Sequence, residues 1–475
     1  MLARSPRALL AALLLLMLLG LMLMNSPAVA VAADPHLGYG VNGWDAGDAG
    51  IGVMGFDWTK VFGAVWYRLP YRVLRRVDVN ASTLNDLEGW GNWLEGEAAA
   101  QAPYIEAWEI GNEPNLDASY GWQAPPNAAD YTRVLCEAYR RIKRADPTAI
   151  VVSAGLAVTG RVPFTWNGHK GYCAPGLSWC PSYYQDEREF LREMLQAGAA
   201  DCFDALGFHP YGFAAPATAS PGSSECGPND FCFRTVEVVR QIMVDEFGVD
   251  KPIWATEFGW LVDPRQVGES ACWDHPSFKG RQWQAVSPDQ QAQYLRDAFV
   301  YAEVNYPWMG GMFVFNYGFS SGMSGCDQMR FYDIKGRPAE AALTAMAKNK
   351  VPARPAWPSS VTLLSDVDAP GTVRGAFRVQ SQTPDPLTWS VVSVSSPHFS
   401  LTFDQTTGAG RDALAFTVDS AGLSTGVYTA TVQVEARPSP PLDKAVPVEG
   451  ATKTVEVVLR VVEEVYRTAL PLVSR

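Results

Sequence analysis

Charge and histidine are both scarce in this chain. Lys, Arg, Asp and Glu make up 19% of the 475 residues, the formal net charge is −12, and there are five histidines. So little charge, together with 47% hydrophobic residues, is not the composition of a disordered protein. The excess of negative charge argues against nucleic acid and anionic membrane surfaces as partners, because both would repel it.

Long apolar runs are absent except at the N-terminus. Two arginines precede an almost unbroken apolar run from Ala8 to Met24, and small residues follow up to Ala33. This pattern predicts a secretory signal over residues 1–33. The alternative is an uncleaved membrane anchor, since about 17 apolar residues reach the lower limit for crossing a bilayer. In both cases we expect the rest of the chain outside the cytoplasm, secreted or at the cell surface.

Cysteine is absent outside residues 136–326, and the eight cysteines there form no C-x-x-C pair. This spacing and the few histidines argue against a zinc site. An even number of cysteines in an exported chain predicts disulfide bonds instead. Cys173 with Cys180, and Cys226 with Cys232, are near enough in sequence to close single loops. The connectivity of all eight stays open, because about 105 pairings are possible.

Residues 34–350 alternate short apolar runs with helical patterns, which predicts βα units around a parallel sheet. We therefore expect the α/β class, with a (β/α)8 TIM barrel in this segment. The expected strands are 37–42, 54–62, 71–79, 104–111, 149–157, 203–209, 252–258 and 309–316. The expected helices include 128–144, 185–197, 234–247, 288–305 and 338–348.

One connection in this pattern is short. Only about eight residues separate Phe62 from Tyr71, whereas a crossover that includes a helix needs a dozen or more. We expect a loop in place of the second helix, because residues 72–79 have a good strand pattern. The alternative is that one strand is misplaced.

The composition changes after residue 350. Residues 351–360 are rich in proline and predict a linker. Residues 361–465 lack cysteine and contain short alternating runs, which predict a small all-β sandwich domain before a tail at 466–475. The expected strands are 361–364, 372–379, 388–394, 399–403, 413–418, 426–434 and 453–462.

Two acidic motifs follow predicted strands. In Trp108-Glu-Ile-Gly-Asn-Glu-Pro114, proline ends the hydrogen-bond ladder, so Glu113 is expected at the C-terminal tip of its strand. In Ile253-Trp-Ala-Thr-Glu-Phe258, a second strand brings Glu257 to the same end. Catalytic groups of (β/α)8 barrels gather on that face. The two carboxylates should therefore face each other across the barrel mouth.

A pair of carboxyl groups suits the cleavage of glycosidic bonds. One carboxylic acid protonates the leaving oxygen, and the other acts as a carboxylate. A separation of about 5–5.5 Å allows direct attack with retention, whereas about 6.5–9.5 Å leaves room for a water molecule and gives inversion. The sequence does not give this distance.

The order Asn-Glu-Pro after the fourth strand and Thr-Glu-Phe-Gly after the seventh resembles clan A of the glycoside hydrolases, including the family 5 and family 39 enzymes. The resemblance covers residues 37–350. It implies a retaining glycoside hydrolase in which Glu113 is the general acid/base, Glu257 is the nucleophile and Asn112 binds the sugar 2-hydroxyl. Residues 361–465 resemble the BACON-like or immunoglobulin-like modules of secreted carbohydrate-active proteins.

The chain departs from the clan A pattern in two places, because the second helix is missing and an expected arginine is absent. Many clan members have an arginine after the second strand that supports the nucleophile. Here that strand offers Lys60, and the nearest arginines are Arg68, Arg75 and Arg76.

Other residues of the expected rim are candidates for substrate binding. His209 and Tyr211 follow the sixth strand, where the resemblance implies contacts with substrate and nucleophile. Trp44, Trp260 and Asn316 follow three further strands and are candidate walls of sugar subsites. The alternative for each is a structural role in packing or in a loop hydrogen bond.

Three functions are compatible with these motifs. The first is a retaining hydrolase of a polysaccharide or oligosaccharide. The second is a non-catalytic carbohydrate-binding or scaffold protein on a decayed barrel, and the third is a transglycosylase with the same catalytic pair. The chemistry needs no metal and no organic cofactor, and we expect a monomer.

Overall fold

The computed structural model describes residues 36–147, 149–160, 171–172, 183–349, 355–356, 360–368, 370–381, 387–409, 412–438 and 452–463. The expected signal segment 1–33, most of the linker 351–360 and the tail 466–475 lie outside these residues. Cys173 and Cys180 lie outside them as well. No helix in the described part of the chain combines the length and the hydropathy needed to cross a membrane.

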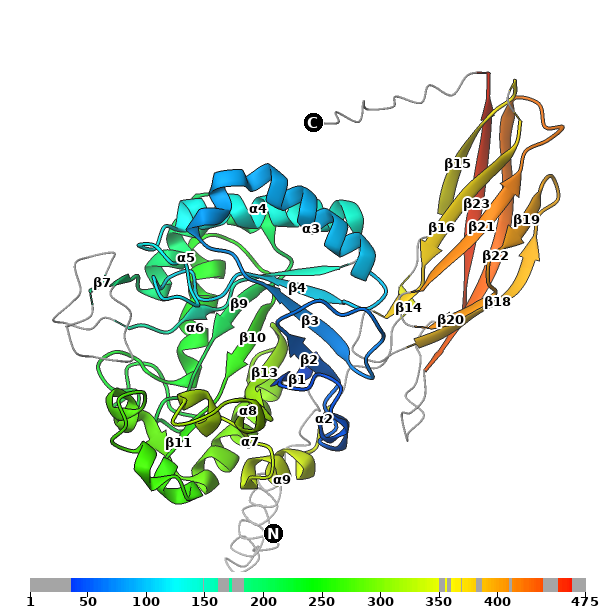
Figure 1. Cartoon of the computed structure of the whole chain (residues 1–475). Coiled ribbons are helices and arrows are strands. Elements are labelled where there is room, and N and C mark those ends of the chain that lie inside the picture. Colours follow the sequence, from blue (N-terminus) through cyan, green and yellow to red (C-terminus); the bar gives the residue numbers. More distant parts are fainter. Residues whose placement is uncertain are drawn as a thin grey trace, which may run out of the picture. The chain divides into compact units, whose positions relative to one another are not determined.

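A parallel sheet that closes on itself forms the first part of the molecule (Figure 1). Its order is β5-β4-β3-β2-β1-β13-β10-β9-β6. The outermost members, β5 (Ile150–Ser153) and β6 (Leu156–Ala157), are separated by only two residues, and a parallel bridge from Val152 to Ala205 joins β5 to the other end of the sheet. The other strands are β1 (Gly38–Gly43), β2 (Trp58–Val61), β3 (Arg72–Val77), β4 (Ala107–Ile110), β9 (Leu206–His209), β10 (Ile253–Phe258) and β13 (Met309–Tyr317).

All eight strands expected in this segment are present, and the mixed α/β class is confirmed. Helices lie around the sheet, and most of them cover its outside (Figure 1). They are α2 (Ala49–Val53), α3 (Leu87–Gln101), α4 (Ala128–Ala145), α5 (Glu187–Gln196), α6 (Val236–Gln241), α7 (Pro288–Asn305), α8 (Phe319–Gly322) and α9 (Pro338–Ala345). Short helical turns are η1 (Ala81–Asp86), η2 (Ala199–Cys202), η3 (Phe233–Thr235), η4 (Ile242–Glu246), η5 (Pro264–Val267), η6 (Ser270–Cys272), η7 (Lys279–Gln284) and η8 (Gln328–Phe331).

The short connection between β2 and β3 is a loop without a helix, as expected. Both strands nevertheless pair in parallel, with Trp58 opposite Arg72. Helix α7 begins where its sequence predicts. The Ser287 side chain accepts a hydrogen bond from the Gln290 backbone N–H, and the Gln290 side-chain oxygen accepts one from the Ser287 backbone N–H. Helix α3 was not among the expected helices, since its glycines and scattered apolar residues give it a weak pattern.

Three disulfide bonds connect cysteines of the described residues. Cys136–Cys202 joins α4 to η2, and Cys272–Cys326 joins η6 to the segment after α8. Cys226–Cys232 closes a single loop, as the spacing of these residues predicted. Such bonds are typical of proteins outside the cytoplasm.

Residues 360–462 form two sheets with a core of their own. One sheet has the order β15-β23-β22-β18-β20 and the other β16-β21-β19. Their strands are β15 (Ser360–Asp366), β16 (Thr372–Arg378), β18 (Leu387–Ser395), β19 (Ser400–Phe403), β20 (Thr407–Ala409), β21 (Ala413–Asp419), β22 (Gly426–Pro438) and β23 (Thr452–Val462). Phe416 of one sheet and Val432 and Leu459 of the other belong to the same buried cluster, as a sandwich requires. All seven expected strands are present, and β20 was missed.

The remaining strands are two residues long. They form the pairs β7 (Gly171–Tyr172) with β8 (Tyr183–Tyr184), β11 (Leu261–Val262) with β12 (Ala285–Val286), and β14 (Pro355–Ala356) with β17 (Gln380–Ser381).

Candidate active site

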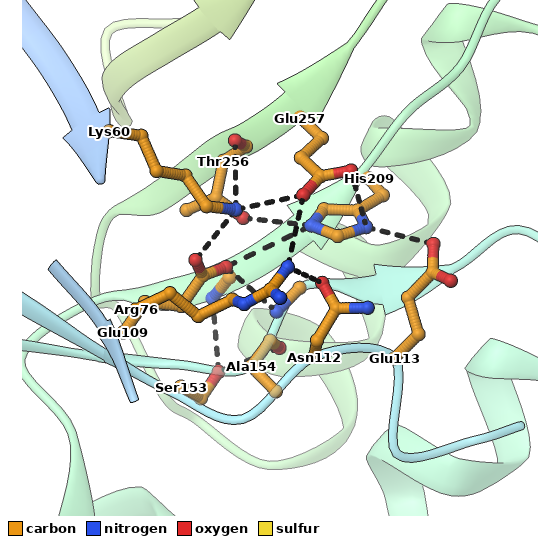
Figure 2. Close-up of polar contacts among 12 residues, drawn as sticks. Lys60, Arg76, Glu109, Asn112, Glu113, Ser153, Ala154, His209, Thr256 and Glu257 are labelled. Carbon is orange, nitrogen blue, oxygen red and sulfur yellow. Dashed lines mark hydrogen bonds and ion pairs between the residues drawn. The ribbon is translucent and has the colours of Figure 1, made fainter. Parts of the chain in front are cut away.

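Glu113 and Glu257 lie at the C-terminal ends of β4 and β10, and both side chains approach His209 (Figure 2). Glu113 has a φ of 41°, a left-handed backbone conformation that is unusual for a residue with a side chain. Its backbone N–H donates to the carbonyl of Gly155 at 3.0 Å, which fixes the turn after β4. Strained residues of this kind cluster at functional sites.

An irregularity in β10 turns Glu257 into the site. The pairing of β10 with β13 shifts register between Ala255 and Phe258, which frees the carbonyl of Thr256 from the ladder. The side chains of Asn42 and Lys60 donate to this carbonyl at 3.2 and 3.4 Å. Bulges next to active sites commonly re-aim a side chain in this way.

The Glu257 carboxylate is buried and held by two donors. Lys60 Nζ donates to Oε1 at 3.0 Å, and the Tyr211 hydroxyl donates to Oε2 at 2.9 Å. Arg76 Nη1 lies 3.8 Å from Oε1. Burial alone would raise the pKa of Glu257, but the charges of Lys60, His209 and Arg76 outweigh it and hold the pKa below its usual value. Glu257 is therefore ionised at neutral pH.

The Glu113 carboxylate shares a partner with Glu257. His209 Nδ1 lies 2.9 Å from Glu113 Oε1 and 3.8 Å from Glu257 Oε2. The distance between the nearest oxygens of the two carboxylates therefore cannot exceed the sum of these two distances. The Glu113 side chain is 14% exposed, compared with 8% for Glu257.

His209 is buried beneath both carboxylates, and its ring nitrogens contact side chains rather than a loop carbonyl. Its Nε2 lies 3.1 Å from the Thr256 hydroxyl and 3.8 Å from Glu109 Oε1. Burial lowers the pKa of His209, but Glu257, Glu109 and Glu113 together raise it to about 9. The imidazole ring is therefore a cation at neutral pH, with a carboxylate on each side.

Glu109 and Lys60 form a fully buried ion pair below the site, with 2.7 Å between Lys60 Nζ and Glu109 Oε2. Burial opposes ionisation of Glu109, yet Lys60 and His209 lower its pKa to about 2. Lys60 therefore connects two carboxylates, Glu109 and Glu257. Lys60 and the more distant Arg76 are the lysine and arginine next to the Glu257 carboxylate.

Asn112 lies beside the pair. Its Oδ1 accepts from Arg76 Nη1 at 3.1 Å, and its Nδ2 donates to the Tyr120 carbonyl at 3.0 Å. These bonds fix the amide at the wall of the cavity that contains both carboxylates.

The cavity has a volume of about 690 Å³ and walls rich in aromatic side chains. Trp44, half exposed, lines it and meets Phe319 edge to face, with 5.5 Å between the ring centroids. Tyr211 lines it as well, whereas His209 lies beneath its floor. No group of three His, Cys, Asp or Glu side chains among the described residues is arranged to hold a metal ion.

Two predicted subsite walls do not reach the cavity. Trp260 is fully buried and donates from Nε1 to the Ala215 carbonyl, so its ring belongs to the core. Asn316 is also fully buried, and its amide donates to the Met329 carbonyl. Both follow strands of the sheet, but the chain turns them away from the mouth, so the packing alternative holds for these two residues.

Glu109 was not identified from the sequence, and Lys60 and Arg76 were assigned no role. A signal was present, because each is a charged residue of a predicted strand and follows an apolar residue by two positions. Lys60 follows Trp58, Arg76 follows Leu74 and Glu109 follows Ala107. In a strand that spacing places both residues on the same face.

Known proteins resemble this chain in structure, whereas no match was found from sequence. No family model matches the chain, and no curated protein matches it. A family 39 glycoside hydrolase from Bacteroides cellulosilyticus WH2 is 15% identical with a TM-score of 0.43, over 82% of this chain and 81% of that one. Bacteroides uniformis β-glucuronidase 2 is 12% identical with a TM-score of 0.40, over 90% of this chain and 46% of that one.

A structure of fungal β-1,4-galactanase is 13% identical with a TM-score of 0.38, over 62% of this chain and 89% of that one. This chain spans less than half the length of the Bacteroides uniformis enzyme. These neighbours are glycoside hydrolases, but at such scores the assignment of the site rests on its own geometry.

Proposed function

We propose that this chain is a secreted retaining glycoside hydrolase that cleaves O-glycosidic bonds of a polysaccharide or oligosaccharide. We infer that residues 34–350 are a (β/α)8 catalytic domain of the clan A type and that residues 361–465 are an accessory module. Residues 1–33 would direct export. Glu113 is proposed as the general acid/base and Glu257 as the nucleophile.

The observation that carries this proposal is the contact of both carboxylates with one histidine nitrogen inside an aromatic-lined cavity. The two distances to His209 Nδ1 set an upper limit on the distance between the nearest carboxylate oxygens. This limit lies below most of the range of about 6.5–9.5 Å typical of inverting enzymes. This limit also includes the separation of about 5–5.5 Å at which the nucleophile attacks directly, and we infer direct attack by Glu257 rather than attack by an interposed water molecule.

The environments of the two carboxylates suit different roles. Glu257, with its lowered pKa and its bonds from Lys60 and Tyr211, is prepared to attack the anomeric carbon as an anion. Glu113, on the wall of the cavity, would protonate the departing oxygen and then remove a proton from water.

Substitution of the two carboxylates tests the assignment. In a screen of aryl glycosides of both anomeric configurations, Glu257→Gln should reduce turnover by about 10⁴-fold or more, as loss of a nucleophile does. Azide should restore some activity and give a glycosyl azide of inverted configuration. With Glu113→Gln, azide should give the retained configuration instead. Full activity of either variant would exclude the assigned role.

A matched control is Glu88→Gln, which makes the same change on an exposed helix residue and should leave kcat/KM unchanged. Binding of glycans by the wild-type chain without release of product after long incubation would favour the binding-protein alternative. Transfer to an added acceptor sugar in preference to water would favour the transglycosylase.

A further inference from the structure

A second arginine reaches the cavity of Glu113 and Glu257, and no contact of the catalytic machinery uses it. Arg281 lies in η7, within the long segment between β10 and α7, and lines the cavity wall. Its side chain is only partly exposed.

The other cations near the reaction centre are already paired. Lys60 contacts Glu109 and Glu257, and Arg76 contacts Asp78 and Glu257. Each of these charges is balanced by a carboxylate of the protein.

Arg281, by contrast, forms no ion pair with any carboxylate in the part of the chain that the structure describes. The residues from 161 to 170 and from 173 to 182, which the structure does not describe, contain neither Asp nor Glu. Among the described residues, no carboxylate therefore balances its positive charge on the cavity wall, and an anionic ligand can do so.

Two tyrosines place Arg281 close to the catalytic pair. Burial and the charge of Glu113 raise the pKa of Tyr120 to about 12, while Arg281 opposes this rise by its charge and by a hydrogen bond. Burial also raises the pKa of Tyr332 to about 12, with Arg281 opposing and Glu113 and Glu257 adding to the rise. The Tyr332 hydroxyl thus lies within the fields of the guanidinium and of both carboxylates.

We propose that the cavity binds an acidic sugar unit and that Arg281 pairs with its carboxylate or sulfate group. This inference rests on the proposed glycosidase function and specifies the substrate class of the same site. A guanidinium group forms two parallel hydrogen bonds with a planar carboxylate, and such bonds are strong where water is partly excluded. The chain as a whole is acidic, with a net charge of −12, so a local cation has to provide the attraction for an anionic sugar.

The test compares aryl glycosides that differ only at C6. The full chain is assayed with matched glucosides and glucuronides, galactosides and galacturonides, and the corresponding 6-sulfates, in both anomeric configurations. We expect the wild type to prefer a uronide or a 6-sulfate over its neutral counterpart. Arg281→Gln should lower the ratio of kcat/KM for the acidic over the neutral substrate by about 30-fold, as loss of a charged hydrogen bond does. Whether the uronide or the sulfate is preferred identifies the anionic group.

Lys279→Gln is the matched control, because it removes one positive charge two residues away on an exposed side chain. It should leave the ratio unchanged. A wild type that prefers neutral sugars, or an Arg281→Gln variant with the wild-type ratio, would overturn the inference while leaving the glycosidase assignment intact.

If no substrate is hydrolysed, calorimetric titration with free glucuronic and galacturonic acid, glucose 6-sulfate and glucose decides. Binding of an acid that is weakened in Arg281→Gln but not in Lys279→Gln would support the inference and reject the catalytic assignment. No difference between acidic and neutral sugars would reject the inference as well.

Discussion

Two layers of side chains inside the closed sheet differ sharply in chemistry, although on most of the strands they share they are only two residues apart. The apolar layer contains Trp58, Leu74, Ala107, Val152, Ala205, Trp254 and Phe313, which contact one another from around the ring. The polar layer, nearer the C-terminal ends of the strands, contains Lys60, Arg76, Glu109, His209 and Thr256.

The comparison shows how one strand can serve both stability and chemistry. The apolar layer is packed, for example by Trp58 against Trp254 with ring centroids 5.2 Å apart. The polar layer is almost as deeply buried, yet most of its side chains are charged and are paired with one another. Buried ion pairs stabilise a fold weakly at best. We infer that the polar layer persists because it fixes Glu257 and His209 in their charged states.

The largest effect is expected from breaking the polar layer at Lys60. Lys60→Met should leave Glu109 and Glu257 buried without their cation and destabilise the protein by about 3–5 kcal/mol. Turnover should fall on the order of 100-fold at temperatures where the variant is folded, because the nucleophile loses its support. Urea denaturation and aryl glycoside kinetics measure the two effects.

A double variant separates stability from function at this position. Lys60→Met combined with Glu109→Gln removes both members of the buried ion pair and should recover at least half of the lost stability, but little of the activity. Full recovery of turnover in the double variant would contradict a functional role for the polar layer.

Breaking the apolar layer should have the opposite signature. Trp254→Ala should destabilise the protein by about 3–5 kcal/mol through lost burial and a residual cavity. The pH dependence of kcat/KM in the folded variant should match that of the wild type, since no ionisable group has moved. A shifted pH profile would show that the two layers are not separable.

The polar layer also predicts how stability depends on pH. The pKa of His209 is about 9 in the folded protein and near 6.5 when unfolded, so its contribution is complete below pH 6.5 and is lost as pH rises through 9. The pKa of Glu109 is about 2, so its contribution is lost as pH falls from about 4.5 through 2. In His209→Gln, the free energy of unfolding should fall less steeply between pH 6.5 and 9. An unchanged slope would contradict the charged histidine.

The sequence predicted the strands and the two carboxylates because both depend on local patterns. Proline after Glu113 and the apolar run before Glu257 mark strand ends without knowledge of neighbours. The sequence could not separate Trp44 from Trp260, because each follows a strand and only the path of the loop decides which ring faces the cavity. Glu109 and Arg281 were missed since their roles depend on contacts with residues distant in sequence.

The smallest effect sharpens this difference between the two tryptophans. Trp44→Ala, at the half-exposed cavity wall, should change the free energy of unfolding by less than about 1 kcal/mol and raise KM several-fold. Trp260→Phe, in the core, should lower stability by about 1–3 kcal/mol with KM unchanged. Thermal denaturation and kinetics on the preferred glycoside check both. Equal effects on KM would mean that Trp260 also contacts substrate.

The central claim is that Glu257 attacks the sugar directly, and trapping the glycosyl-enzyme tests it. The chain is incubated with a panel of 2-deoxy-2-fluoroglycosyl fluorides, neutral and uronic, and then analysed by intact mass and peptide mapping. We expect one equivalent of label on the peptide that contains Glu257, and none in Glu257→Gln. Label on Glu113, or turnover without a trapped intermediate and with inversion seen by NMR, would contradict the account.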